Sequence, residues 1–228
     1  MKAIVEIFLL TASILLAGAT ASASETGPGV DADTALKKLL DGNRSYVSNQ
    51  MTIKESVGPA TRRALALGQR PYAVILSCSD SRVPPEIIFD KGLGEIFVVR
   101  VAGNIPDPIV IGSIEYAVEH LGSSLIMVLG HSRCGAVDAA VEATGHEHRN
   151  IGAIIKTIAP AVRLAKKETK GSNKSELLEA AIDFNIKLAA QSLVKQSSVL
   201  RSLVNSGKVK IVAAKYDLDD GFVRLLGN

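Results

Sequence analysis

Three short, continuous apolar runs rich in valine and isoleucine dominate the hydropathy pattern; they cover residues 72–76, 96–101 and 125–129. Runs of this length without polar alternation are typical of strands that are buried on both faces of a parallel sheet. Residues 108–122, between the second and third runs, have apolar side chains at helical spacing: Ile109, Ile114, Ala117, Val118 and Leu121. The order predicts a strand–helix–strand unit with a right-handed crossover.

Helical and turn patterns fill most of the remaining chain. Asp33 is the expected N-cap of a first helix, and further helices are expected over the following ranges: 59–67, 134–145, 151–167 and 175–204. Residues 207–226 alternate in polarity and contain a turn at Asp219-Asp220-Gly221, which predicts a fourth strand with a hairpin partner. The predicted class is α/β, with a small and mostly parallel sheet flanked by helices.

Length and composition favour a single globular domain and argue against a nucleic-acid partner. The chain has 228 residues, of which 47% are hydrophobic, so it can bury a substantial core. The formal charge is +3, and no stripe of lysine and arginine interleaves with aromatic residues. We therefore expect one domain over residues 33–228 and no nucleic-acid binding.

The N-terminus has the order of a secretory signal. Lys2 precedes an apolar run over residues 7–19, and small residues follow in AGATASASE. The run is shorter than the roughly 20 residues of an ordinary membrane span. We expect a signal peptide at residues 1–23, a linker at 24–32, and a periplasmic or secreted product without a membrane anchor. An uncleaved anchor is the alternative.

The two cysteines allow either a disulfide or a metal site. Outside the cytosol a disulfide between Cys78 and Cys134 is the default expectation. However, Cys78 follows the first apolar run, while His131 and Cys134 follow the third, and the carboxyl ends of parallel strands share one crevice. Two thiolates and an imidazole suit zinc, and Asp80 would supply a fourth oxygen ligand or an acceptor beside the ion. A disulfide would give His131 and Asp80 no shared role.

Four stretches carry a family resemblance: CSDSRVPPE, GEIFVVRVAGN, GSIEYAV and VLGHSRCGAVDAA. From about Leu39 to the C-terminal YDLDDGFVRLL, the chain resembles the β-class carbonic anhydrases, in an exported bacterial form. The resemblance implies a zinc lyase whose Zn²⁺ is held by Cys78, His131 and Cys134. It also implies reversible hydration of CO2 to bicarbonate and a proton, through a zinc-bound hydroxide that Asp80 and Arg82 orient as a paired dyad.

The family has two arrangements of its metal site. In one, the fourth position is open to water; in the other, the aspartate closes it, and bicarbonate occupies a regulatory pocket that contains a tryptophan. The sequence has no tryptophan, so that pocket cannot be built in the same way. We therefore expect the open type, with Asp80 as a metal ligand only if the site is closed.

Five further residues are expected at the substrate. The resemblance places Gln69 where open-type members contact substrate, Phe97 and Tyr116 in the aromatic pocket, and Ala102 where many members have valine, which widens the pocket. The backbone N–H of Gly135, at a predicted helix start, is expected to donate to bicarbonate oxygens.

Assembly and rival functions complete the expectations. The family implies a homodimer or homotetramer whose pocket a neighbouring subunit completes. The same fold and ligands can hydrolyse CS2 or COS instead of hydrating CO2. A non-catalytic exported protein, stapled by a disulfide or storing metal, is the rival outside enzymes.

Overall fold

The structure is a computed structural model that describes residues 29–145, 150–170 and 173–227. Its centre is a five-stranded sheet with the order β2-β1-β3-β4-β5, in which the first four strands are parallel and β5 is antiparallel to β4. The strands are β1 (Ala73–Ser77), β2 (Ile96–Arg100), β3 (Leu125–His131), β4 (Lys210–Tyr216) and β5 (Val223–Leu225). The predicted mostly parallel α/β sheet is confirmed. The expected signal peptide lies outside the described residues.

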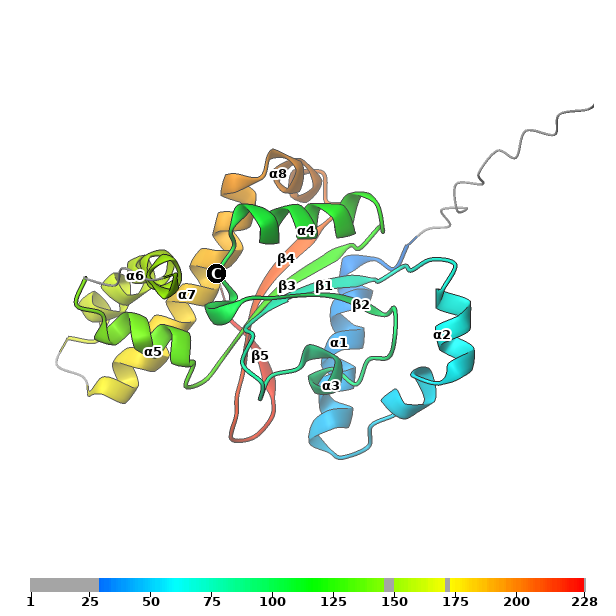
Figure 1. The fold of residues 1–228 in the computed structure, drawn as a ribbon, viewed down its shortest axis with the longest axis horizontal. Helices are drawn as coiled ribbons and strands as arrows, with labels where there is room; N and C mark the ends of the chain where they lie inside the picture. Colours follow the sequence, from blue (N-terminus) through cyan, green and yellow to red (C-terminus); the bar gives the residue numbers. More distant parts are fainter. Residues whose placement is uncertain (1–28, 146–149, 171–172, 228) are drawn as a thin grey trace, which may run out of the picture.

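Helices flank this sheet on both sides. They are α1 (Ala32–Val47), η1 (Ile53–Ser56), α2 (Pro59–Leu65), α3 (Pro85–Ile88), η2 (Ala102–Asn104), α4 (Pro108–Glu119), α5 (Gly135–Glu142), α6 (Ile151–Glu168), α7 (Lys174–Gln196) and α8 (Ser198–Asn205). Figure 1 shows α5, α6 and α7 packed together to the left of the sheet, with α2 on the right. No helix in the described ranges has both the length and the apolar character that a membrane crossing requires.

Two helix boundaries differ from the sequence prediction because short polar side chains cap backbone N–H groups. Asp31, rather than Asp33, caps α1 and accepts from the N–H groups of Asp33 (3.0 Å) and Thr34 (2.9 Å). The predicted single helix over 175–204 is broken at Ser197, which has an extended backbone and accepts from the N–H of Leu200 (3.0 Å). Ser197 thereby ends α7 and starts α8.

Two predictions of burial are wrong. The run that forms β2 is partly exposed, because this strand lies at the sheet edge and has a neighbour on one side only. Ile109 is 81% exposed instead of lying on the buried stripe of α4. The buried face of that helix includes Val110, Ile114 and Ala117, and Ile109 is about 100° away from Val110 around the axis.

The register of the parallel strands fixes the position of the site. Ser77, the last residue of β1, lies opposite Leu129 of β3 and Arg100 of β2. Both β1 and β3 are buried along their whole length. Cys78 directly follows β1 and His131 ends β3, so the two residues emerge at the same carboxyl edge of the sheet.

Candidate metal centre

Three buried side chains converge at the carboxyl edge of the sheet. Ligand atoms of Cys78, His131 and Cys134 all lie within 4.8 Å of one another. The two sulfur atoms are 4.0 Å apart and both thiols are free. A disulfide has an S–S length of about 2.05 Å, so the disulfide expected by default for exported cysteines is not formed here.

The imidazole of His131 presents one free nitrogen to this cluster. Its Nδ1 lies 3.0 Å from the carbonyl oxygen of Ser132, which can only accept, so Nδ1 carries the proton. In the neutral ring, Nε2 is then the acceptor nitrogen; it is buried and has no hydrogen-bond partner among the described residues. A buried acceptor without a donor beside two buried thiols fits a Zn²⁺ ion, which accepts sulfur and nitrogen ligands. The Nδ1 contact also fixes the tautomer that a metal requires.

The pKa values of the two thiols are shifted in opposite directions. A hydrogen bond from Cys134 lowers the pKa of Cys78 to about 4, although burial opposes the shift, and the backbone N–H of Gly103 adds to the lowering. The neighbouring Cys78 thiolate, together with burial, raises the pKa of Cys134. One proton is therefore shared between the two sulfurs. A divalent ion needs both thiolates, so its binding would release that proton.

Asp80 and Arg82 form a two-pronged ion pair next to the cluster. Arg82 donates from Nε to Oδ1 (2.9 Å) and from Nη2 to Oδ2 (2.7 Å), and its backbone N–H also donates to Oδ1 (3.0 Å). These contacts hold the pKa of Asp80 well below its usual range, against the effect of partial burial. Oδ2 of Asp80 is 3.8 Å from Nε2 of His131, so the ionised carboxylate faces the cluster.

Arg100 supports the turn between these residues, and the sequence analysis did not identify it. Its Nε donates to the carbonyl of Cys78 (3.0 Å), and its Nη2 donates to the carbonyl of Asp80 (2.6 Å). Arg100 is the last residue of β2 and lies opposite Ser77, the last residue of β1. The available sequence signal for this contact was the charge of Arg100 itself, near the end of the otherwise apolar run over residues 96–101.

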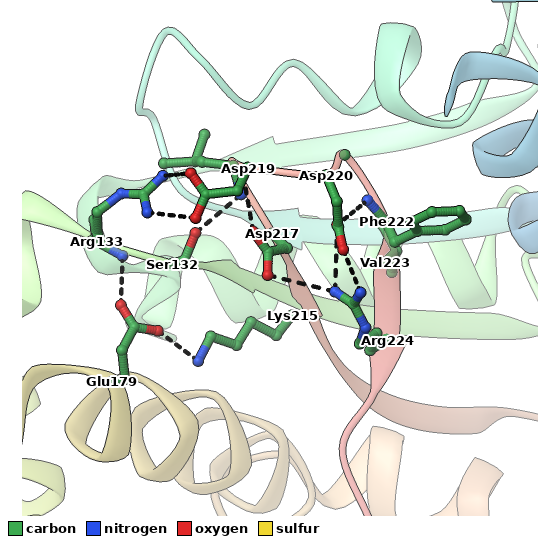
Figure 2. A network of polar contacts seen from close by, with 12 residues as sticks. Ser132, Arg133, Glu179, Lys215, Asp217, Asp219, Asp220, Phe222, Val223 and Arg224 are labelled. Atoms are coloured by element: carbon green, nitrogen blue, oxygen red, sulfur yellow. Dashed lines mark hydrogen bonds and ion pairs between the residues drawn. The ribbon is translucent and has the colours of Figure 1, made fainter. Parts of the chain in front are cut away.

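The loop between the second and third cluster residues is tied to distant elements (Figure 2). Arg133 has a left-handed backbone, with φ 52°, and its N–H donates to Oε1 of Glu179 on α7 (2.9 Å). Its guanidinium binds both carboxylate oxygens of Asp219, at 2.7 and 2.8 Å. The sequence predicted a turn at Asp219 but gave no sign that this turn contacts the loop.

The predicted substrate residues occupy four different places. Phe97 on β2 and Tyr116 on α4 lie beside each other, with ring centroids 6.4 Å apart, and Tyr116 is 49% exposed. Ala102 begins η2, and Gly135 begins α5 directly after Cys134. Gln69 is exposed between α2 and β1. The structure thus pairs the two aromatic residues, while the contacts of all five with substrate stay predictions.

The fold and the site together define the class of protein. It is an α/β protein whose parallel sheet carries a buried Cys, His and Cys of the kind that binds zinc, at the carboxyl edge of its strands. The profile of the family described as "Carbonic anhydrase" matches residues 73–223. "Carbonic anhydrase 2" of Mycobacterium tuberculosis is 39% identical over 197 residues, which are 85% of this chain and 92% of that protein. "Carbonic anhydrase" of Mycolicibacterium smegmatis is 38% identical over 201 residues, or 87% and 95% of the two chains.

Solved structures agree with this relationship. The β-carbonic anhydrase CafA of Aspergillus fumigatus is similar with a TM-score of 0.69 and 25% identity, and the match covers 84% of this chain and 90% of that one. A Coccomyxa β-carbonic anhydrase in complex with acetazolamide has a TM-score of 0.70 at 23% identity, over 84% and 86% of the two chains. The chain therefore belongs to the β-carbonic anhydrase family, whose members are zinc enzymes.

Proposed function

We propose that this protein catalyses the reversible hydration of CO2 to bicarbonate and a proton, with Zn²⁺ held by Cys78, His131 and Cys134. The observation that carries the proposal is the buried cluster with an unpartnered imidazole nitrogen, next to an ionised carboxylate. When bound there, Zn²⁺ lowers the pKa of a water ligand and supplies a nucleophile near neutral pH.

Asp80 would orient the attacking water. Its Oδ2 faces the cluster, where it would accept a hydrogen bond from a water at the site and so fix the orientation of that water toward CO2. Arg82 donates to both carboxylate oxygens, which keeps Asp80 ionised and competes with its direct ligation of a metal. This geometry supports the open type of site, in which Asp80 is not a metal ligand.

The substrate would lie between apolar and donating groups. Phe97 and Tyr116, which lie beside each other, would offer aromatic surface to CO2. The small side chain of Ala102 would leave more room for substrate than the valine of many family members. The backbone N–H of the exposed residue Gly135, at the start of α5, and the amide of Gln69 would donate to bicarbonate oxygens as negative charge develops.

The direct test of this function uses the wild-type protein. We expect about one zinc per subunit by elemental analysis and CO2 hydration in a stopped-flow indicator assay that is lost on zinc removal and restored on reloading. The same protein is then assayed with CS2 and COS. Faster turnover of either compound than of CO2, or zinc-loaded protein without any turnover, would contradict the proposal.

We also propose that the mature protein is exported and forms a homodimer or homotetramer. Support comes from the signal-like residues 1–23, from the exposed side chain of Ile109, and from the partly exposed edge strand β2. Two β-carbonic anhydrases of Sordaria macrospora, similar in fold with a TM-score of 0.69, are tetrameric. Native mass spectrometry of the protein purified from cells that express the full-length sequence measures both the subunit mass and the number of subunits. We expect a subunit that lacks residues 1–23 and an even-numbered assembly. A full-length subunit or a monomer refutes the corresponding part.

A further inference from the structure

Helix α7 reaches the loop that surrounds Cys78 through one buried amide. Asn185 is 5% exposed, on a helix face that also buries Ile182, Ile186 and Ala189. Its Nδ2 donates to the carbonyl oxygen of Gly103 in η2 at 2.8 Å. A hydrogen bond at this distance, shielded from water, constrains the carbonyl strongly.

Gly103 in turn touches a predicted metal ligand. Its N–H donates to Sγ of Cys78 at 3.3 Å, and both residues are buried. The carbonyl and the N–H of Gly103 belong to neighbouring peptide groups that meet at its Cα. Fixing the direction of the carbonyl therefore limits the direction in which the N–H can point.

The backbone around Gly103 needs such an external restraint. Gly103 has φ 72° and ψ 17°, and Asn104 follows with φ 46°, so two consecutive residues are left-handed. Glycine adopts this conformation without a penalty, but at Asn104 it is less favourable and persists where surrounding contacts enforce it. A Cβ at Gly103 would come within 2.7 Å of Cδ1 of Ile158, so the loop is also closely packed against α6.

We propose that Asn185 is a positioning residue of the metal centre. By holding the Gly103 carbonyl, it aims the Gly103 N–H at the sulfur of Cys78 and so sets both the position and the electron donation of that thiolate. The proposal rests on the zinc site of the proposed function. A hydrogen bond to a coordinating thiolate withdraws electron density from it and tunes the bound ion.

The test compares two buried asparagines. Asn185→Leu keeps the branched shape of the side chain, although its methyl groups are larger than the amide atoms, and it removes the donor to Gly103. Asn43→Leu is the matched control, because Asn43 is also buried and donates to backbone carbonyls, of Ile88 (3.2 Å) and Gly221 (2.9 Å), neither of which is a residue of the metal cluster or of η2. Asn43 also accepts from the N–H of Val223 (2.9 Å), so its loss is expected to cost stability. Each variant is characterised by chelator competition for Zn²⁺, by the sulfur-to-metal charge-transfer band of the Co²⁺-substituted protein, and by urea unfolding.

We expect Asn185→Leu to bind Zn²⁺ about tenfold more weakly and to shift the Co²⁺ band. Asn43→Leu should lose stability in urea but keep the wild-type zinc affinity and band. Wild-type affinity and an unshifted band in Asn185→Leu would overturn the proposal, as would equal changes in both variants, which would indicate a purely structural role. If Asn185→Leu does not fold, Asn185→Asp takes its place, since it keeps the shape and replaces the donor with an acceptor.

The wild-type measurements separate this proposal from the proposed function. Wild-type protein without zinc and without CO2 hydration would refute the proposed function itself. Wild-type protein with both properties, together with an unchanged Asn185 variant, would refute only the role of Asn185.

Discussion

Replacing Cys78 by alanine is expected to reduce the zinc content from about one ion per subunit to background and to abolish CO2 hydration. The variant leaves only His131 and Cys134 as donors, and two side chains do not hold zinc against a chelator in a site built for three. It also removes the thiolate toward which the Gly103 N–H points. Elemental analysis after gel filtration in the presence of a weak chelator measures the first effect, and stopped-flow hydration measures the second.

The neighbouring residue provides the control for this variant. Ser77 is fully buried at the end of β1, and its Oγ has no hydrogen-bond partner among the described residues. Ser77→Ala therefore removes a buried polar atom beside the cluster without removing a ligand or a hydrogen bond, and it should retain zinc and activity. Wild-type zinc content in Cys78→Ala would end the assignment of Cys78 as a ligand.

Asp80→Asn is expected to keep its zinc and to lose about 100-fold in kcat. The metal stays because Cys78, His131 and Cys134 are unchanged. Turnover falls because a neutral amide accepts a weaker hydrogen bond than a carboxylate and offers an N–H₂ group on one side, so the attacking water is no longer held in one orientation. Stopped-flow kinetics and zinc analysis on the same sample give the two values.

The pH profile sharpens this prediction. Since Arg82 holds the pKa of Asp80 well below its usual range, the wild-type carboxylate stays charged throughout the neutral and alkaline range. The loss in the variant should thus be of similar size from about pH 6 to pH 9. A loss confined to one end of that range would contradict an orienting role for a permanently charged Asp80.

Two further variants separate the role of the dyad from that of charge alone. Arg82→Lys preserves the positive charge but cannot reproduce the two-pronged contact, so it should lower kcat while retaining zinc. Asp220→Asn removes a carboxylate from another aspartate–arginine pair, with Arg224 in the C-terminal hairpin, which Figure 2 shows at the surface loop between β4 and β5. Exposed ion pairs contribute little to stability, so this control should keep wild-type activity.

Full activity in Asp80→Asn, in contrast, would remove the proposed orienting role of Asp80.

The local chemistry of the site could be read from the sequence, for a physical reason. Asp80 and Arg82 are two residues apart in a turn, so the short chain between them brings the carboxylate to the guanidinium. The convergence of Cys78 with His131 was also predictable, because fully apolar runs of strand length predict strands of one parallel sheet, and parallel strands end at one edge. That the two strands are direct neighbours came from the structure.

The supporting contacts were not predictable in the same way. Asn185 is 82 residues from Gly103 along the chain, and Glu179 is 46 residues from Arg133. A helical pattern shows which residues share a face of α7, but it does not show which loop that face meets. The exposure of Ile109 likewise depended on how α4 packs, since helical spacing alone is compatible with a slightly rotated helix.

The sequence by itself thus determined the elements, the edge of the sheet at which the chemistry lies, and the ligand types, because periodicity and short-range spacing specify these features locally. Only the tertiary structure decided which distant groups hold the ligands in place: Arg100 at the backbone of Cys78, Gly103 at its sulfur, and Asn185 behind Gly103. Such contacts depend on the relative placement of packed elements, and that placement is set by the whole core rather than by any one segment.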